Sequence, residues 1–271
     1  SLADKHKVEA KCAVGIGKES SVSFNRRFKM KSGVQWTHPG KGNPEILEPA
    51  GPIDPNVGVL SAWGMDGKFL GCVVNFACHG TTMGGAGYSA DWPYYLDKTI
   101  RDVMGADSTV VFLNGACGDV TQVDNLSMRE KEFGEKWARR VGQKVGAEAL
   151  KVIAEAEPGD LKPVNAARRI IQIEKREIPP ERLKWAYDLV KTKTMKEDYR
   201  WVFARDIILL NEIKKFEPTV NCELQAIQIG PAVFISNPAE LFCQLGLEIK
   251  SASNFPYTFV VELANGCIGY V

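Results

Sequence analysis

The sequence predicts an α/β fold, with a mixed β-sheet core flanked by helices and with active-site loops at the strand ends. Short apolar runs such as residues 108–113 are typical of buried strands. They alternate with longer segments in which apolar residues recur every three or four positions, as in amphipathic helices. The chain has 271 residues, 45% of them hydrophobic, which is enough to bury a sizeable core.

The individual elements follow from periodicity and from turn residues. An Asp66-Gly67 pair separates two apolar runs and predicts a tight hairpin turn. Pro158-Gly159 ends the clearest amphipathic segment. In chain order we predict a hairpin of strands 57–63 and 69–77, a helix 91–104, a strand 108–113, a helix 127–155, a strand 166–176, strands 222–229 and 232–236, a helix from about Glu240, and a strand 257–263.

Two segments do not fit this alternation. Residues 30–58 are rich in Gly and Pro, which predicts a long surface excursion. Residues 179–216 read as a charged helical stretch whose aromatic residues we expect to form its packing face. We find no inter-domain linker, so residues 1–271 are predicted to be a single domain that contains this stretch.

Composition excludes several classes of function. The formal net charge is +1, which does not indicate a nucleic-acid-binding surface. The longest nearly uninterrupted apolar run is Phe69–Cys78, too short for a membrane-spanning helix of about 20 residues. The seven cysteines contain no C-x-x-C pair, which argues against a zinc ribbon, and the glycines around Gly15 and Gly17 do not match a phosphate-binding P-loop. A soluble enzyme is the expected class.

Polar or glycine-rich segments follow four of the predicted strands at the point where each strand ends. Because ligands bind where loops converge over strand ends, these segments predict one shared site. The four segments are Ala77–Thr82, Asn114–Asp119, Asn237–Glu240 and Ala264–Tyr270.

Six short motifs in this order resemble the neutral/alkaline, non-lysosomal ceramidase family, particularly its divergent bacterial members. The resemblance covers most of residues 20–155 and 222–271. The motifs are Ser23–Arg27, Gly51–Pro55, Asn75–Thr81, Tyr88–Pro93, Phe112–Val120 and Ala264–Val271.

The resemblance implies a zinc-dependent amidase that cleaves the N-acyl bond of ceramide in sphingolipid metabolism. The family holds its metal with two His, one Glu and one Tyr. By this correspondence His79, Glu240 and Tyr270 are the expected zinc ligands in this chain. Asn114, Asp119 and Tyr270 are the expected catalytic residues, and Asp91 or Asp119 is expected to orient His79 through its second ring nitrogen.

The sequence departs from the family pattern at three places. The first ligand His of the family has no counterpart, because His6 and His38 lie in other contexts and are expected at the surface. Gly115 stands where the ceramidases carry a Ser, so a serine role is not transferred. The chain begins without Met and stops at Val271, and we therefore expect a central excerpt of a larger catalytic domain, truncated at both ends.

The sequence is compatible with three functions. The first is zinc-dependent hydrolysis of an amphipathic N-acyl substrate, with secretion or the periplasm implied by the resemblance. The second drops the metal and uses Cys117 as a nucleophile with His79 as its base, although no basic neighbour in the sequence lowers the thiol pKa. The third is a non-catalytic relative that binds a lipid or a glycan.

Overall fold

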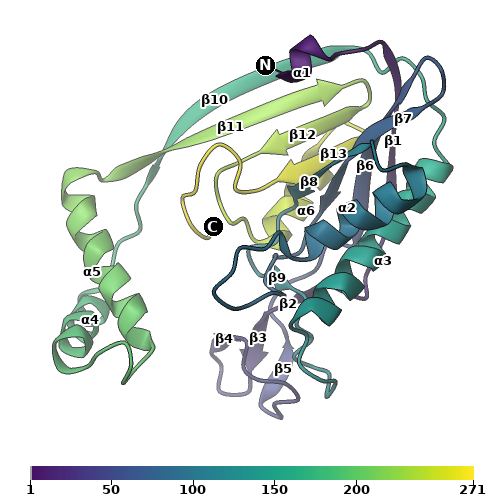
Figure 1. The fold of residues 1–271 in the computed structure, drawn as a ribbon. Coiled ribbons are helices and arrows are strands. Elements are labelled where there is room, and N and C mark those ends of the chain that lie inside the picture. The colour runs from purple at the N-terminus through teal and green to yellow at the C-terminus, as the bar shows by residue number, and fades with distance from the viewer. Residues whose placement is uncertain (1) are drawn as a thin grey trace. The chain divides into compact units, whose positions relative to one another are not determined.

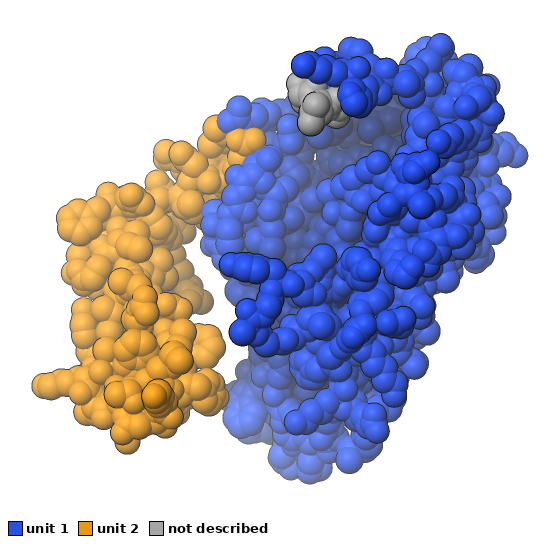
Figure 2. Space-filling view, in the orientation of Figure 1, with its two compact units in different colours: residues 1–168, 224–271 blue, residues 169–223 orange. Residues whose placement is uncertain are grey.

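The predicted α/β class is confirmed by the structure, a computed structural model that describes residues 2–271. The chain divides into two compact units, residues 1–168 with 224–271, and residues 169–223 (Figure 2). The first unit contains every predicted site residue. The prediction of a single domain over residues 1–271 stays a prediction.

The first large sheet has the order β1-β6-β7-β8, and its last two strands are parallel. The predicted hairpin is confirmed as β6 and β7, and Gly67 takes the positive φ of 82° that the tight turn requires. The first strand was not predicted, because its small residues give little β signal. The strands are β1 (Ala10–Lys18), β6 (Asn56–Gly64), β7 (Phe69–Phe76) and β8 (Thr109–Asn114).

The second large sheet has the order β10-β11-β12-β13. β11 and β12 are antiparallel, whereas β12 and β13 run parallel. All four strands were predicted within a few residues of their limits. They are β10 (Val164–Glu174), β11 (Thr219–Ile229), β12 (Ala232–Ser236) and β13 (Tyr257–Val261).

Two small sheets lie where the sequence gave weaker signals. β2 (Phe24–Asn25) pairs with β9 (Val120–Thr121), which brings the Asn-Arg-Arg segment beside the loop after β8. The predicted surface excursion contains a sheet of order β4-β3-β5. Its strands are β3 (Arg27–Met30), β4 (Gln35–Thr37) and β5 (Ile46–Pro49).

Helices of the first unit cover both large sheets. α2 (Asp91–Met104) and α3 (Glu135–Ala154) lie side by side on one face of the first sheet (Figure 1). α6 (Cys243–Ala252) packs against β13, and a short α1 (Leu2–Lys5) begins the described chain. α3 starts later than predicted, after Gly134 with a φ of 86°.

The second unit contains two packed helices where one helical stretch was predicted. They are α4 (Pro180–Thr192) and α5 (Arg200–Phe216), and Ala186 and Ala204 are their fully buried residues. The prediction that the aromatic residues form the packing face was wrong in part, because Tyr187, Tyr199 and Phe203 are exposed. Among residues 2–271 no helix has the length and apolar character that crossing a membrane requires.

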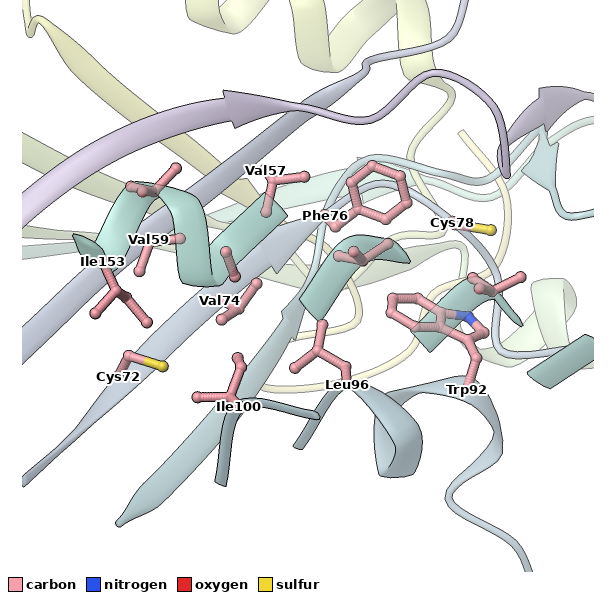
Figure 3. Packing of buried hydrophobic residues seen from close by; sticks show 14 of the residues in the cluster. Val57, Val59, Cys72, Val74, Phe76, Cys78, Trp92, Leu96, Ile100 and Ile153 are labelled. Atoms are coloured by element: carbon pink, nitrogen blue, oxygen red, sulfur yellow. The ribbon is translucent and has the colours of Figure 1, made fainter. Parts of the chain in front are cut away.

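The core of the first unit has two layers. Between the first sheet and its helices, Trp92, Leu96 and Ile100 of α2 pack on Phe76 and Val74 (Figure 3). Between the two large sheets, Phe234, Phe259 and Val261 of the second sheet face apolar residues of the first. This packing holds the ends of β7, β8, β12 and β13 in one region.

Asn75 joins the two sheets through a buried amide. Its Nδ2 donates to the Leu113 carbonyl at 3.0 Å and to the Val260 carbonyl at 2.9 Å. The side chain is buried, so water does not replace these bonds. The amide therefore fixes β8 and β13 relative to each other close to the strand ends where the predicted site segments begin.

Asn75→Ala is expected to lower the free energy of unfolding by roughly 2–4 kcal/mol, because two buried carbonyls lose a donor. Urea denaturation followed by circular dichroism measures the change. Asn165→Ala is the matched control, since its amide bonds Gln228 at an exposed position. Equal midpoints for both variants would contradict the bridging role of Asn75.

Candidate active site

The loops after β7, β8, β12 and β13 meet through backbone hydrogen bonds. His79 N–H donates to the Val120 carbonyl at 3.1 Å, and Gly118 N–H donates to the Leu241 carbonyl at 2.8 Å. Glu240 N–H in turn donates to the Gly269 carbonyl at 2.9 Å. Segments far apart in the sequence are therefore held edge to edge.

The structure brings together the three residues that the resemblance named as metal ligands. His79 Nε2 lies 3.1 Å from Glu240 Oε2. The rings of His79 and Tyr270 are stacked with centroids 6.4 Å apart and planes at 3°. Glu240 and Tyr270 also form an isolated parallel β-bridge, which explains why α6 begins three residues after Glu240 and not at it.

The second ring nitrogen of His79 faces a different set of atoms. Nδ1 lies 3.1 Å from the Val120 carbonyl oxygen and 3.2 Å from Cys117 Sγ. Burial lowers the pKa of His79, and the nearby Arg26 cation lowers it further. The imidazole is therefore neutral near pH 7, with one ring nitrogen protonated and the other free to accept.

Arg26 was not predicted as a site residue, although its Asn-Arg-Arg motif was noted. Its Nη2 donates to the Gly118 carbonyl at 2.7 Å and lies 3.4 Å from His79 Nε2. The guanidinium also sits 5.4 Å from the centroid of the Tyr270 ring. Arg26 and Glu240 thus face the same ring nitrogen: the guanidinium favours a free lone pair on Nε2, whereas the Glu240 carboxylate favours a proton there.

Cys117, Glu262 and Asn114 form a buried cluster behind His79. Cys117 Sγ–H donates to Glu262 Oε1 at 2.9 Å, and the Cys117 backbone N–H donates to Glu262 Oε2 at 2.9 Å. Asn114 Nδ2 lies 3.2 Å from both Cys117 Sγ and Glu262 Oε1. Glu262 was missed, and its only sequence signal is a charge directly after an apolar strand.

Burial dominates the ionisation of this cluster. It raises the pKa of Glu262 to about 7, although hydrogen bonds from Cys117 oppose the shift. Burial also raises the pKa of Cys117 well above its usual value, and the Glu262 carboxylate adds to the rise. The cysteine is therefore a thiol, not a thiolate, at neutral pH.

Neither of the two aspartates expected to orient His79 does so, and that prediction is wrong. Asp91 accepts from Thr82 Oγ1, Met83 N–H and Trp92 N–H, and so braces the loop before α2. Asp119 accepts from Cys243 N–H and Asn25 Nδ2, both at 2.9 Å. The orienting acceptor is the Val120 carbonyl, which no side-chain pattern reveals. The catalytic roles of Asn114, Asp119 and Tyr270 stay predictions.

The structure also describes the positions at which the sequence departs from the family pattern, Gly115 and the two other histidines. A Cβ built on Gly115 lies 3.0 Å from the Ala77 backbone nitrogen, so the packing leaves little room for a serine there. His6 and His38 are exposed, as expected, and His38 Nδ1 lies 3.3 Å from Asn125 Nδ2.

The fold was compared with known proteins. It matches the crystal structure of neutral ceramidase from Pseudomonas aeruginosa with a TM-score of 0.64 and 18% sequence identity, over 97% of this chain and 46% of that one. It also matches a ceramidase complexed with C2, with a TM-score of 0.65 and 18% identity, over 97% of this chain and 48% of the other. No protein-family model and no curated protein matches the sequence.

The chain has the neutral ceramidase fold. The resemblance predicted from the six motifs is thereby confirmed for the fold. The chain spans about half the length of the two ceramidase structures that it matches. The activity, substrate and metal of a ceramidase therefore enter below as proposals for this chain.

Two sets of side chains in this ceramidase fold offer metal donors. The first is His79 Nε2, Glu240 and Tyr270, an imidazole, a carboxylate and a phenol, which are donors that zinc accepts. With Nδ1 protonated, Nε2 and Glu240 Oε2 are two acceptors only 3.1 Å apart, and a cation fits such a pair. In the second set, His79, Cys117 and Glu262, the ligand atoms all lie within 4.8 Å of one another. Both sets depend on His79, through opposite nitrogens.

Glu262 makes the stability of the fold depend on pH in a defined direction. Burial raises its pKa from an ordinary 4.5 to about 7 in the folded protein, so its stabilising contribution is present below about pH 4.5 and is lost as the pH rises through 7. Glu262→Gln imitates the protonated form. Relative to this variant, the wild type is expected to lose roughly 3 kcal/mol between pH 4.5 and 8.

Urea denaturation of both proteins across this pH range measures the difference. Glu248→Gln, at an exposed position of α6, is the control. A wild type that gains stability over Glu262→Gln as the pH rises would contradict the direction of the shift.

Proposed function

We propose that the protein is a zinc-dependent amidohydrolase that cleaves the N-acyl bond of a small amphipathic, ceramide-like substrate with activated water. The observation that carries the proposal is the convergence of His79, Glu240 and Tyr270 at the strand ends of a ceramidase fold. We also propose that these 271 residues belong to one catalytic domain. Secretion or a periplasmic location is proposed from the resemblance alone.

The donor set fits a zinc ion, and each residue has a definable part. His79 presents Nε2 while the Val120 carbonyl holds Nδ1–H, as metal-bound histidines usually require. Glu240 supplies the negative charge, and Tyr270 supplies a phenol on the solvent side, with 54% of the residue exposed. When bound there, zinc would acidify a water molecule and polarise the amide carbonyl.

Other residues of the chain complete the proposed site. Arg26 is a fixed donor beside His79 and Tyr270, where it stabilises negative charge on a carbonyl oxygen. Asn114, as a donor behind the cluster, and Asp119, which fixes the start of α6, are proposed to act by positioning. The exposed Tyr270 marks the side of the proposed site that faces solvent.

A thiol hydrolase is the second candidate, because Cys117 Sγ lies 3.2 Å from His79 Nδ1. Two observations weigh against it. Cys117 is fully buried, and its thiol proton faces Glu262 and not the histidine. A non-catalytic lipid- or glycan-binding relative is the third candidate, supported by Gly115 in place of the family serine. Zinc content and iodoacetamide sensitivity distinguish the three.

This chain is expected to bind zinc weakly, because among its described residues the proposed site contains one imidazole, that of His79, where the family pattern has two. Isothermal titration with zinc chloride measures the affinity, and His79→Ala should remove the remaining binding. His6→Ala is the control. Tight, stoichiometric zinc held by His79 with no second histidine would show that this ligand set is wrong.

In a preparation that hydrolyses an N-acyl sphingosine analogue, Glu240→Gln is expected to lower both zinc affinity and kcat/KM. The loss should exceed the ~100-fold that removal of an outer hydrogen-bond partner costs. Cys117→Ser should keep most of the activity, since the zinc reaction makes no use of the sulfur. Full activity in Glu240→Gln together with loss in Cys117→Ser would replace the zinc amidase by the thiol hydrolase.

A further inference from the structure

The first large sheet ends on one side at β1, which pairs with β6 along one of its edges only. In an antiparallel pair, successive residues point their backbone N–H and C=O groups alternately toward the partner strand and away from it. Cys12 N–H points away from β6, because it donates to the Gly159 carbonyl at 2.9 Å. Lys18 N–H also points away and donates to Glu148 Oε1 at 2.9 Å. These contacts occupy the outer edge of β1 at both ends.

Two residues between these ends have unused backbone groups. Val14 and Ile16 belong to the same alternate set as Cys12 and Lys18, so their N–H and C=O groups also point away from β6. Among the described residues, no hydrogen bond occupies any of these groups. The outer edge of β1 is therefore free over a short stretch that can pair with a strand of a few residues.

A cavity of about 510 Å³ runs beside this free edge, which is within the size range of ligand pockets. α3 contacts β1 on one face of the sheet, and it lines the cavity with Val152 and Ala156. The second sheet packs on the other face and lines the cavity with Pro231 and Tyr257. Both covering layers thus extend past β1. A strand added at this edge would continue the first sheet between them.

The cavity is also negatively charged. Glu155 and Glu157 line it, and both residues are exposed. Neither carboxylate has an ion-pair or hydrogen-bond partner in the described part of the chain. Lys151, one helical turn before Glu155, lies 3.7 Å from Glu148 instead. The cavity therefore combines free backbone donors and acceptors with uncompensated carboxylates, a combination that favours an extended backbone with cationic side chains.

We propose that this cavity, the β1 slot, docks an extended peptide segment of a partner protein. The segment adds as a short strand to Val14 and Ile16 and places a Lys or Arg side chain beside Glu155 and Glu157. Main-chain hydrogen bonds supply the affinity, and the two carboxylates select a cationic sequence. The proposal goes beyond the proposed function and does not rest on it. The slot lies at the opposite edge of the sheet from β8, the strand that leads into the candidate site.

The probe is the peptide acetyl-Val-Lys-Val-Lys-Val-amide, and the readout is amide hydrogen exchange, resolved by residue with ¹⁵N NMR. In the free protein we expect fast exchange at Val14 and Ile16. Exchange should be slow at Ala13 and Gly15, whose N–H groups point toward β6. Saturating peptide should slow exchange at Val14 and Ile16 by about 10-fold or more, because both amides then donate to the added strand.

Two variants locate the binding. Ile16→Pro removes an outward N–H, and proline is tolerated on an edge strand whose N–H faces solvent. This variant should keep its circular dichroism and bind the peptide about 10-fold more weakly. The double variant Glu155→Gln/Glu157→Gln should weaken the Lys peptide about 5-fold and leave a peptide with Gln in place of Lys unaffected. Glu248→Gln, at an exposed position of α6, is the control.

Three results of the peptide experiment would overturn the proposal. They are no binding of the Lys peptide, binding without slower exchange at Val14 and Ile16, and equal affinity of the wild type for the Lys and Gln peptides. Slow exchange at both residues in the free protein also rejects it, and a dimer in sedimentation velocity would then identify a second copy as the occupant. If Ile16→Pro does not fold, the double Gln variant decides the test.

Discussion

The site depends on one buried carboxylate, that of Asp119, which is 1% exposed. One oxygen accepts the N–H of Cys243 at the start of α6, and the other accepts from Asn25 and, at 3.4 Å, from Arg27. Charged acceptors of this kind give some of the strongest hydrogen bonds in proteins. A single side chain thus joins the loop after β8 to the Asn-Arg-Arg segment and to the helix that follows Glu240. Arg26 lies between Asn25 and Arg27, two of the residues that this carboxylate contacts, and Gly118 directly precedes Asp119.

The fold was largely predictable where local pattern and burial agree. The limits of α2 match the predicted 91–104, because its apolar face, its charged face and the Gly105 that follows all point to the same helix. β1 and the small sheet of β3, β4 and β5 were missed. Their short, exposed or glycine-rich strands are stabilised by partners distant in sequence, and no local periodicity records such pairing.

The same distinction applies to the site. His79 and Glu240 could be found because recognisable turn residues mark the end of a strand or the start of a helix beside each of them. Tyr270 could be found because it belongs to a sequence motif. Glu262 could not be found, because its contact is with Cys117, a residue 145 positions away in the sequence. The two residues meet only when the ends of β8 and β13 pack together. The orienting acceptor of His79 is a backbone carbonyl, and every residue has one. The sequence therefore indicated the side chains that converge at the site better than the groups that hold them in place.

The two chemistries considered for this site compete for one imidazole. Zinc requires a lone pair on His79 Nε2, whereas a Cys117 nucleophile requires that lone pair on Nδ1, so a neutral ring supports one or the other. Burial keeps the ring neutral, and Arg26 and the Val120 carbonyl favour the first state, whereas the Glu240 carboxylate favours a proton on Nε2 unless a cation lies between the two groups. Glu262 weighs against the second chemistry, because it raises the pKa of Cys117 and accepts its thiol proton, and both effects make the cysteine a poor nucleophile.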